Sequence, residues 1–122
     1  MISTTLHFND KANTSSLPKF AQGSISFNTG ALNGYSGYAY QYGRIGISSL
    51  LINAKNYGTN LTMANLGIAP PIEQTHIAID YWGSNLGCEG YVNTSTNLIL
   101  NLPTGANNHD LKILCVYITK IL

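Results

Sequence analysis

The chain has 122 residues, of which 44% are hydrophobic and only 9% charged, whereas an ordinary domain has about 25% charged residues. This composition excludes an intrinsically disordered chain, which is rich in charge and poor in aromatic residues, and the length suits a single domain over residues 1–122. Six basic and five acidic residues give a formal charge of +1 without any basic cluster, which excludes a nucleic-acid groove and a polybasic membrane surface.

Residues 1–20 predict little regular structure. Pro18 and the polar run at residues 13–16 are typical of loops, so we expect a loosely ordered lead-in or linker. The stretch lacks the basic and apolar regions of a secretion signal. No apolar run in the chain approaches about 18 residues, so we also expect no membrane insertion.

From residue 21 onwards, Gly, Asn and Pro interrupt the chain about every ten residues, a spacing that is typical of all-β folds. No window shows the apolar spacing of a helix over three turns. We therefore predict an all-β fold, an antiparallel β-sandwich or barrel of about eight strands. The predicted strands occupy residues 21–30, 35–43, 44–54, 59–66, 73–82, 88–94, 97–102 and 110–122.

Three connections between these strands have recognisable turn chemistry. Residues 93–97 predict a tight hairpin, in which Asn97 is able to take the left-handed conformation. The two prolines of residues 68–71 exclude a central strand there, because proline has no N–H for the ladder. Residues 103–110 predict a longer loop before the last strand.

The last predicted strand is apolar on both faces. One face carries Leu111, Ile113, Cys115, Tyr117, Thr119 and Ile121, and the other carries Lys112, Leu114, Val116, Ile118 and Lys120. An antiparallel sheet normally turns one polar face to water, and a sandwich of this length has a single core. The second apolar face therefore needs another cover, and an identical subunit is favoured over a crossing loop of the same chain.

Residues 76–82 hold a distinctive set of side chains. If the large apolar residues of this stretch face the core, the period of two places four others on one face: His76, Ala78, Asp80 and Trp82. Trp82 offers a flat apolar platform, and Asp80 accepts paired hydrogen bonds from neighbouring hydroxyls, so the pattern suits a saccharide. The alternative is that Trp82 packs at a strand end or a subunit interface and that Asp80 caps the next turn.

Tyrosines form a second candidate surface. Tyr38, Tyr40 and Tyr42 share one face of their strand by the same period. They suit ligand binding, because Tyr supplies rigid amphipathic contact area, and they equally suit covering the sheet or lining a subunit seam.

Signals for catalysis and for metal binding are weak, and we predict neither an enzyme nor a cofactor. Glycoside hydrolysis needs two carboxylates about 5–9.5 Å apart, for which Asp80 with Glu89 or Glu73 is the candidate pair. His76, His109 and Asp110 lack metal-binding spacing. Cys88 and Cys115 also lack such spacing and are interpreted as small apolar residues of strands; whether they pair stays open.

Four segments together resemble a known family. "YGRIGISSLLI" precedes "LGIAPP", and "EGYVNTSTNLIL" precedes the terminal "KILCVYITKIL". Over roughly residues 36–122 they resemble the C-terminal head domains of receptor-binding proteins and tail fibres of siphophages that infect Gram-positive bacteria, the lactococcal phages among them. The chain departs from the pattern where Asn97 stands in place of a family Gly and where no coiled-coil neck precedes the domain.

The resemblance implies a compact β head that forms a homotrimer and binds host cell-wall saccharides at or near subunit interfaces. It implies a place in the virion, at the tail tip or baseplate, with other baseplate or tail proteins as partners. The candidate saccharide-binding residues are Trp82, Asp80, His76, Tyr40 and Arg44. Two other functions stay open, namely a structural or decoration β-domain of a virion and a lectin-like module of a larger protein.

Overall fold

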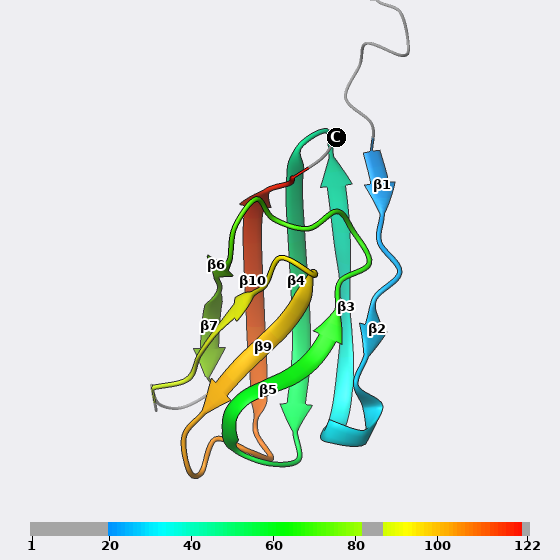
Figure 1. Cartoon of the computed structure of the whole chain (residues 1–122). Coiled ribbons are helices and arrows are strands. Elements are labelled where there is room, and N and C mark those ends of the chain that lie inside the picture. The colour runs from blue at the N-terminus through cyan, green and yellow to red at the C-terminus, as the bar shows by residue number, and fades with distance from the viewer. Residues whose placement is uncertain (1–19, 82–86, 121–122) are drawn as a thin grey trace, which may run out of the picture.

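The computed structural model describes residues 20–81 and 87–120, and it shows two antiparallel sheets of five strands each (Figure 1). The first sheet has the order β1-β3-β4-β10-β7 and the second has the order β2-β5-β9-β8-β6. The strands are β1 (Phe20–Gln22), β2 (Ser26–Phe27), β3 (Leu32–Tyr42), β4 (Ile45–Ala54), β5 (Gly58–Asn65), β6 (Thr75–His76), β7 (Ala78–Tyr81), β8 (Glu89–Val92), β9 (Asn97–Leu102) and β10 (Asp110–Ile118). The predicted all-β sandwich is confirmed. In these described ranges, no helix is long and apolar enough to cross a bilayer.

The described residues form ten strands rather than about eight, because two predicted strands change sheet part-way. Residues 21–30 divide into β1, which pairs with β3, and β2, which pairs with β5. Residues 73–82 divide into β6, which pairs with β8, and β7, which pairs with β10. Each divided segment therefore closes one side of the sandwich by joining the edges of both sheets.

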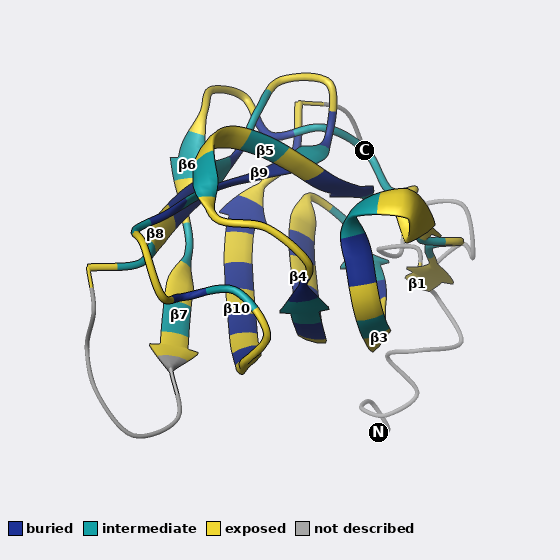
Figure 2. Ribbon diagram, turned by 90° about the horizontal axis from the view of Figure 1, so that it is seen from below, coloured by how far each residue is buried: buried dark blue, intermediate teal, exposed yellow. Residues whose placement is uncertain are grey.

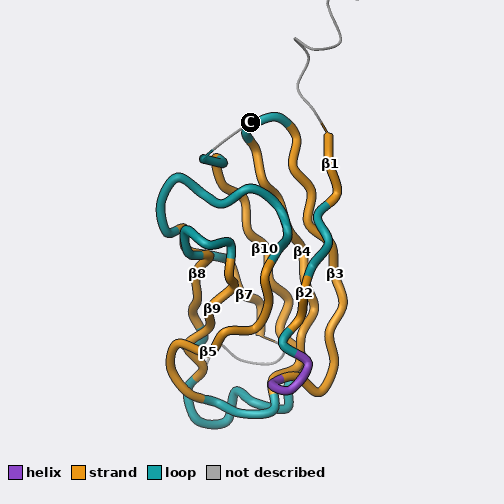
Figure 3. Tube along the Cα trace, turned by 45° about the vertical axis from the view of Figure 1, so that its right-hand side comes forward, coloured by secondary structure: helices purple, strands orange, loops and turns teal. Residues whose placement is uncertain are grey.

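Gly23 makes the first of these two crossings sterically feasible. Its N–H donates a 2.7 Å hydrogen bond to the carbonyl oxygen of Ala39 in β3. A Cβ at this position would lie 2.6 Å from both the Leu66 carbonyl oxygen and Ile68 Cγ2. The chain can pass this close to its neighbours only because glycine has no side chain. A short 3₁₀ turn, Thr29–Ala31, then leads into β3 (Figure 3).

The centre of the first sheet is a long, regular ladder. β4 pairs with β3 on one side and with β10 on the other, and the β10 pairing runs without interruption from Asp110↔Asn53 to Ile118↔Ile45. Along β10, inward residues are buried and outward residues are exposed in strict alternation, as the banding in Figure 2 shows. The period-of-two prediction for the last strand is thus confirmed.

The core lies between the two sheets. It includes Leu50, Ile52, Leu98, Leu100 and Ile113, each at most 1% exposed. Tyr117 enters it opposite Gly46, where a Cβ would lie only 2.8 Å from the ring, and its hydroxyl donates a 2.8 Å hydrogen bond to the Ala69 carbonyl.

The two cysteines are free thiols, as their interpretation as strand residues allows. Cys115 lies in the core, and burial raises the pKa of its thiol to about 11. Cys88 is half-buried just before β8, and burial also raises the pKa of its thiol.

Outward residues of the first sheet form a continuous surface that we call the apolar face. Nine of its large side chains are 40–65% exposed: Phe20, Tyr38, Tyr42, Ile45, Ile47, Leu51, Leu114, Val116 and Ile118. Tyr40 lies among them, with its ring 5.2 Å from Phe20 and 5.3 Å from Tyr38. Within residues 20–81 and 87–120, no segment therefore covers the second face of β10.

The hairpin between β8 and β9 is confirmed, but its left-handed residue is Thr96 (φ 67°) and not Asn97. Asn97 is the first residue of β9. The Asn93 side-chain oxygen accepts hydrogen bonds from the N–H groups of Ser95 (2.9 Å) and Asn97 (3.0 Å). This Asx-type bridging holds the turn, so the strain of a β-branched residue at positive φ falls on Thr96.

Candidate functional site

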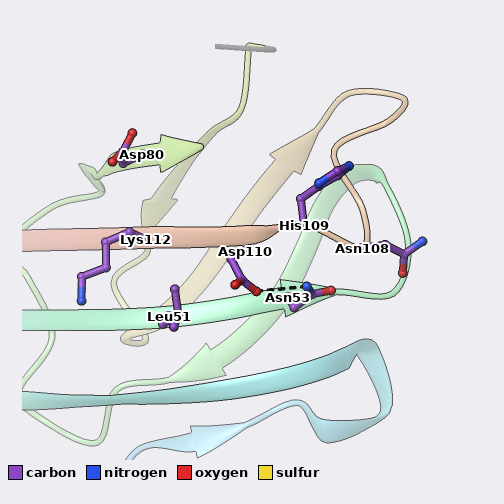
Figure 4. Close-up of a pocket in the computed structure, with 7 residues that line it drawn as sticks. All are labelled: Leu51, Asn53, Asp80, Asn108, His109, Asp110 and Lys112. Carbon is purple, nitrogen blue, oxygen red and sulfur yellow. Dashed lines mark hydrogen bonds between the residues drawn. The ribbon is translucent and has the colours of Figure 1, made fainter. Parts of the chain in front are cut away.

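An open groove of about 530 Å³ lies at one end of the apolar face (Figure 4). Three strands of the first sheet and the loop before β10 contribute to it. Its lining residues are Leu51 and Asn53 of β4, Asp80 of β7, Asp110 and Lys112 of β10, and Asn108 and His109 of the loop.

The floor of the groove consists of two cross-strand rows. Lys112 lies between Leu51 of β4 and Asp80 of β7, and Asp110 lies opposite Asn53. All five side chains project outward because they occupy alternate positions of paired strands. Ladder pairing alone therefore brings together residues that are up to 61 positions apart in the chain, from Leu51 to Lys112.

A hydrogen-bond network fixes the polar side chains at the outer end of the groove. Asn53 Nδ2 donates to Asp110 Oδ1 at 3.1 Å. Asn33 Nδ2 donates to the side-chain oxygens of Asn53 and Asn108, both at 2.9 Å. Because three amides and a carboxylate orient one another, their remaining donors and acceptors point in set directions before a ligand arrives.

The loop at residues 103–109 is held against the end of β4. The Asn108 N–H donates to the Ala54 carbonyl at 2.8 Å, and Asn107 Nδ2 donates to the Lys55 carbonyl at 3.2 Å. Asn108 adopts the left-handed conformation with φ 64°, which asparagine tolerates better than most residues. These contacts place Asn108 and His109 over the start of β10.

The groove has the chemistry of a site for a polar, uncharged or weakly cationic ligand. Two carboxylates against one ammonium leave an excess of one negative charge when His109 is neutral. Carboxylates accept hydrogen bonds, the ammonium donates them, and the carboxamides do both. Leu51, which is 40% exposed, adds one apolar contact. Over the part of the chain that the structure describes, no group of three His, Cys, Asp or Glu side chains could hold a metal ion.

A smaller hollow of about 140 Å³ continues the groove toward β3. It shares Leu51, Asn53 and Asp110 with the groove and adds Gly34 and Ser36 of β3. The combined surface crosses four neighbouring strands, β3, β4, β10 and β7, which gives it the length for a ligand of more than one ring.

Of the four predicted binding residues that the structure describes, Asp80 is the one that lines the groove. The prediction that His76 shares its face is wrong. His76 belongs to β6 of the second sheet, opposite Tyr91, whereas Asp80 belongs to β7 of the first sheet, opposite Lys112. The period of two orders side chains only along one continuous strand, and this chain crosses between sheets at Ile77.

Tyr40 and Arg44 also lie away from the groove. Tyr40 stands in the row of Ile47 and Val116, with two strands between it and β7. Arg44 lies in the turn between β3 and β4 at the other end of the sheet, where Nη2 donates a 3.0 Å hydrogen bond to the Thr119 carbonyl. Trp82 lies outside the described residues, so its part as a platform stays a prediction.

The sequence interpretation missed most of the groove. Five of its polar lining residues are not among the predicted binding residues: Asn53, Asn108, His109, Asp110 and Lys112. A usable signal was present, because the alternation of the last strand already put Asp110 and Lys112 on one face. That alternation does not show that β10 pairs with β4 and β7, which supply the rest of the groove.

The carboxylate pairs considered for glycoside hydrolysis are divided between different elements. Glu89 is an exposed residue of β8 in the second sheet, and Glu73 precedes β6. The carboxylate that shares the groove with Asp80 is Asp110.

Comparisons of the chain with protein-family models, with curated proteins and with solved structures found no match.

Proposed function

We propose that this protein is a non-enzymatic, saccharide-binding adhesion head, of the kind found at the tail tip or baseplate of phages, and that it works as a homotrimer. The single observation that carries the proposal is the groove of alternating carboxylate, ammonium and carboxamide groups around Leu51. Host cell-wall saccharides are the proposed ligand, and other tail or baseplate proteins are the proposed neighbours.

The chemistry of the groove supports a sugar ligand. Each sugar hydroxyl both donates and accepts a hydrogen bond, and the groove offers both kinds of partner within two adjacent rows. Asp80 and Asp110 can each accept a pair of hydroxyl hydrogen bonds, and the Leu51 side chain can contact the C–H face of a ring. An open groove with one apolar contact suits weak, specific binding rather than enclosure of a reacting group.

The position of the groove also supports an adhesion head. The described chain enters the first sheet at Phe20, in the same cross-strand row as Tyr42, Ile45 and Ile118. The rows of the groove, at Lys112 and Asp110, lie at the other end of the ladder. A head held at the end where β1 begins would therefore present its groove away from the attachment.

A homotrimer would compensate for weak single sites. Once one copy has bound, the second and third contacts become intramolecular, and overall avidity can exceed the single-site affinity by about 10²–10⁴-fold.

Binding to purified cell-wall polysaccharide from Gram-positive hosts tests the proposal. We expect Asp80→Asn and Asp110→Asn each to weaken binding roughly 10- to 100-fold, because a hydrogen bond to a charged group contributes about 1.5–3 kcal/mol. Glu89→Gln is the matched control, since it removes one exposed carboxylate from the other sheet. Titration calorimetry and co-sedimentation with cell walls measure the effect.

Two results would contradict the proposal. Wild-type protein that binds no cell-wall glycan would favour a structural or decoration β-domain, a function that the exposed apolar face also suits. Release of reducing ends from the polysaccharide, lost in Asp80→Asn, would make the groove an active site instead.

A further inference from the structure

The apolar face is larger than a solitary soluble domain normally exposes. Three of its nine large side chains are aromatic, a type that can bury about 150–250 Å² each, and six are smaller aliphatic ones. At roughly half exposure they present on the order of 900 Å² together. The largest apolar patch on a typical monomer measures about 300–600 Å². A stable interface buries about 800 Å² on each partner, so this face alone is large enough to be one.

Three of the four cross-strand rows of the face carry no charge, and only the row of Leu51 contains charged residues. Besides the large apolar residues, the outward positions of the three uncharged rows hold only Gln22, Tyr40, Ser49 and Ala78. Charged side chains occur beyond both ends: Arg44 follows the row of Tyr42, and the Lys112–Asp80 row begins the groove. An uncharged surface with charged limits can meet an identical surface without like-charge repulsion.

The face is also held in one shape. β4, its middle strand, is hydrogen-bonded along its length to β3 and β10. Buried residues support it from the core side, among them Leu50, Ile52 and Ile113 at no more than 1% exposure. A preformed surface loses little conformational freedom on association, which favours a partner of fixed shape.

We propose that a second copy of this chain covers the apolar face, with the contact centred on Ile47, Leu114 and Val116. The inference deepens the oligomeric part of the proposed function, on which it rests, by assigning the surface that joins the copies. A second copy fits because it presents an uncharged, apolar surface of the same area. In the homotrimer the apolar faces of three copies meet around one axis, so each face contacts both of the other copies and loses its water there.

The groove remains open in this arrangement. Leu51 is the only residue of the apolar face that also lines the groove, so the two surfaces meet along one row. A symmetry axis that runs along the strands would place the groove of every copy at the same end of the assembly. All copies could then contact one host surface at once.

Light scattering on the full chain tests the assignment. We expect wild type to have a mass near three times 13.2 kDa. We expect Tyr38→Lys and Val116→Lys to shift the mass toward the single chain while the far-UV circular dichroism spectrum is retained. Tyr57→Lys is the matched control, because Tyr57 is also 51% exposed but lies in the connection between β4 and β5. We expect this control to keep the wild-type mass.

Either of two results would overturn the inference. One is a single-chain mass for wild type throughout the micromolar range. The other is dissociation by Tyr57→Lys to the same extent as by Tyr38→Lys. If the lysine variants of the face unfold, Tyr38→Ser and Val116→Ser repeat the test with a smaller change, and an unchanged mass there would likewise overturn it.

The same variants separate this inference from the proposed function. Val116→Lys is expected to bind a short, monovalent cell-wall oligosaccharide as wild type does, and to lose only its tight binding to whole cell walls. Asp80→Asn is expected to keep the wild-type mass and lose the oligosaccharide. An assembled protein without glycan binding would end the proposed function alone, whereas a single-chain protein that binds the oligosaccharide would end the interface assignment alone.

Discussion

The two sheets have the same number of strands and the same antiparallel pairing, but their outward faces differ. The second sheet turns polar residues outward at Thr62, Asn101, Glu89 and His76. The first sheet turns out Tyr, Ile, Leu and Val along β3, β4 and β10. The second is the ordinary water-facing side of an antiparallel sandwich. This difference supports the proposal that the first sheet makes two contacts, one with the core and one with other copies of the chain.

The sharpest test of this difference uses neighbours on β10. Ile113 is 0% exposed and Leu114 is 48% exposed. We expect Ile113→Ala to lower the free energy of unfolding by about 2–5 kcal/mol, because it leaves a cavity in the core. Leu114→Ala should change the stability of the isolated chain by less than about 1 kcal/mol. Guanidinium unfolding at several protein concentrations measures both, and equal losses would show that the outward face supports the fold itself.

A second test makes the first sheet resemble the second. The triple variant Ile47→Thr, Leu114→Thr and Val116→Thr keeps residues that suit strands but replaces the apolar centre by hydroxyls. We expect this variant to be a soluble single chain with a mass of about 13.2 kDa, and its far-UV circular dichroism spectrum to be the same as that of wild type. Light scattering and circular dichroism measure this. If the variant still forms an oligomer, the outward apolar residues of the first sheet do not determine which sheet contacts another copy.

The smallest expected effect compares two serines of β4. Ser48 is 1% exposed, and its hydroxyl has no hydrogen-bond partner among the described residues. Ser49, the next residue, lies on the outward side opposite Tyr38 and Leu114. We expect Ser48→Ala to stabilise the fold by about 1 kcal/mol, because an unpaired buried hydroxyl is removed. Ser49→Ala should change stability by about 0.5 kcal/mol or less. Thermal unfolding distinguishes them, and a loss for Ser48→Ala would indicate a partner for its hydroxyl.

Strand periodicity predicted much of the fold because a pleated strand imposes it locally. The alternation from Asp110 to Ile118 and the shared face of Tyr38, Tyr40 and Tyr42 follow from geometry within one strand. The hairpin at residues 93–97 follows from its Asn and Ser/Thr content, although Thr96 and not Asn97 takes the left-handed position. In that turn the deciding factor is the bridging Asn93 side chain, which local preference does not capture.

The changes of sheet at Gly23 and Ile77 could not be predicted from the sequence. Nothing in a run of alternating residues marks the point at which the strand changes its pairing partner. Because the chain crosses at Ile77, His76 lies in the second sheet and Asp80 in the first. The same crossing places Asp80 opposite Lys112, and the pair Asn53 and Asp110 lies in the next row. Of the site predicted along this strand, His76 therefore lies on the other sheet, and residues of β4 and β10 join Asp80 in the groove instead.

By itself, the sequence determined an all-β chain with a last strand that is apolar on both sides, because composition and alternation are properties of single strands. Only the tertiary structure decided that no described segment covers Leu114, Val116 and Ile118, and that a polar groove lies at one end of their face. The physical reason is that backbone hydrogen bonds pair strands that are far apart in the sequence. This pairing determines which side chains lie beside each outward residue.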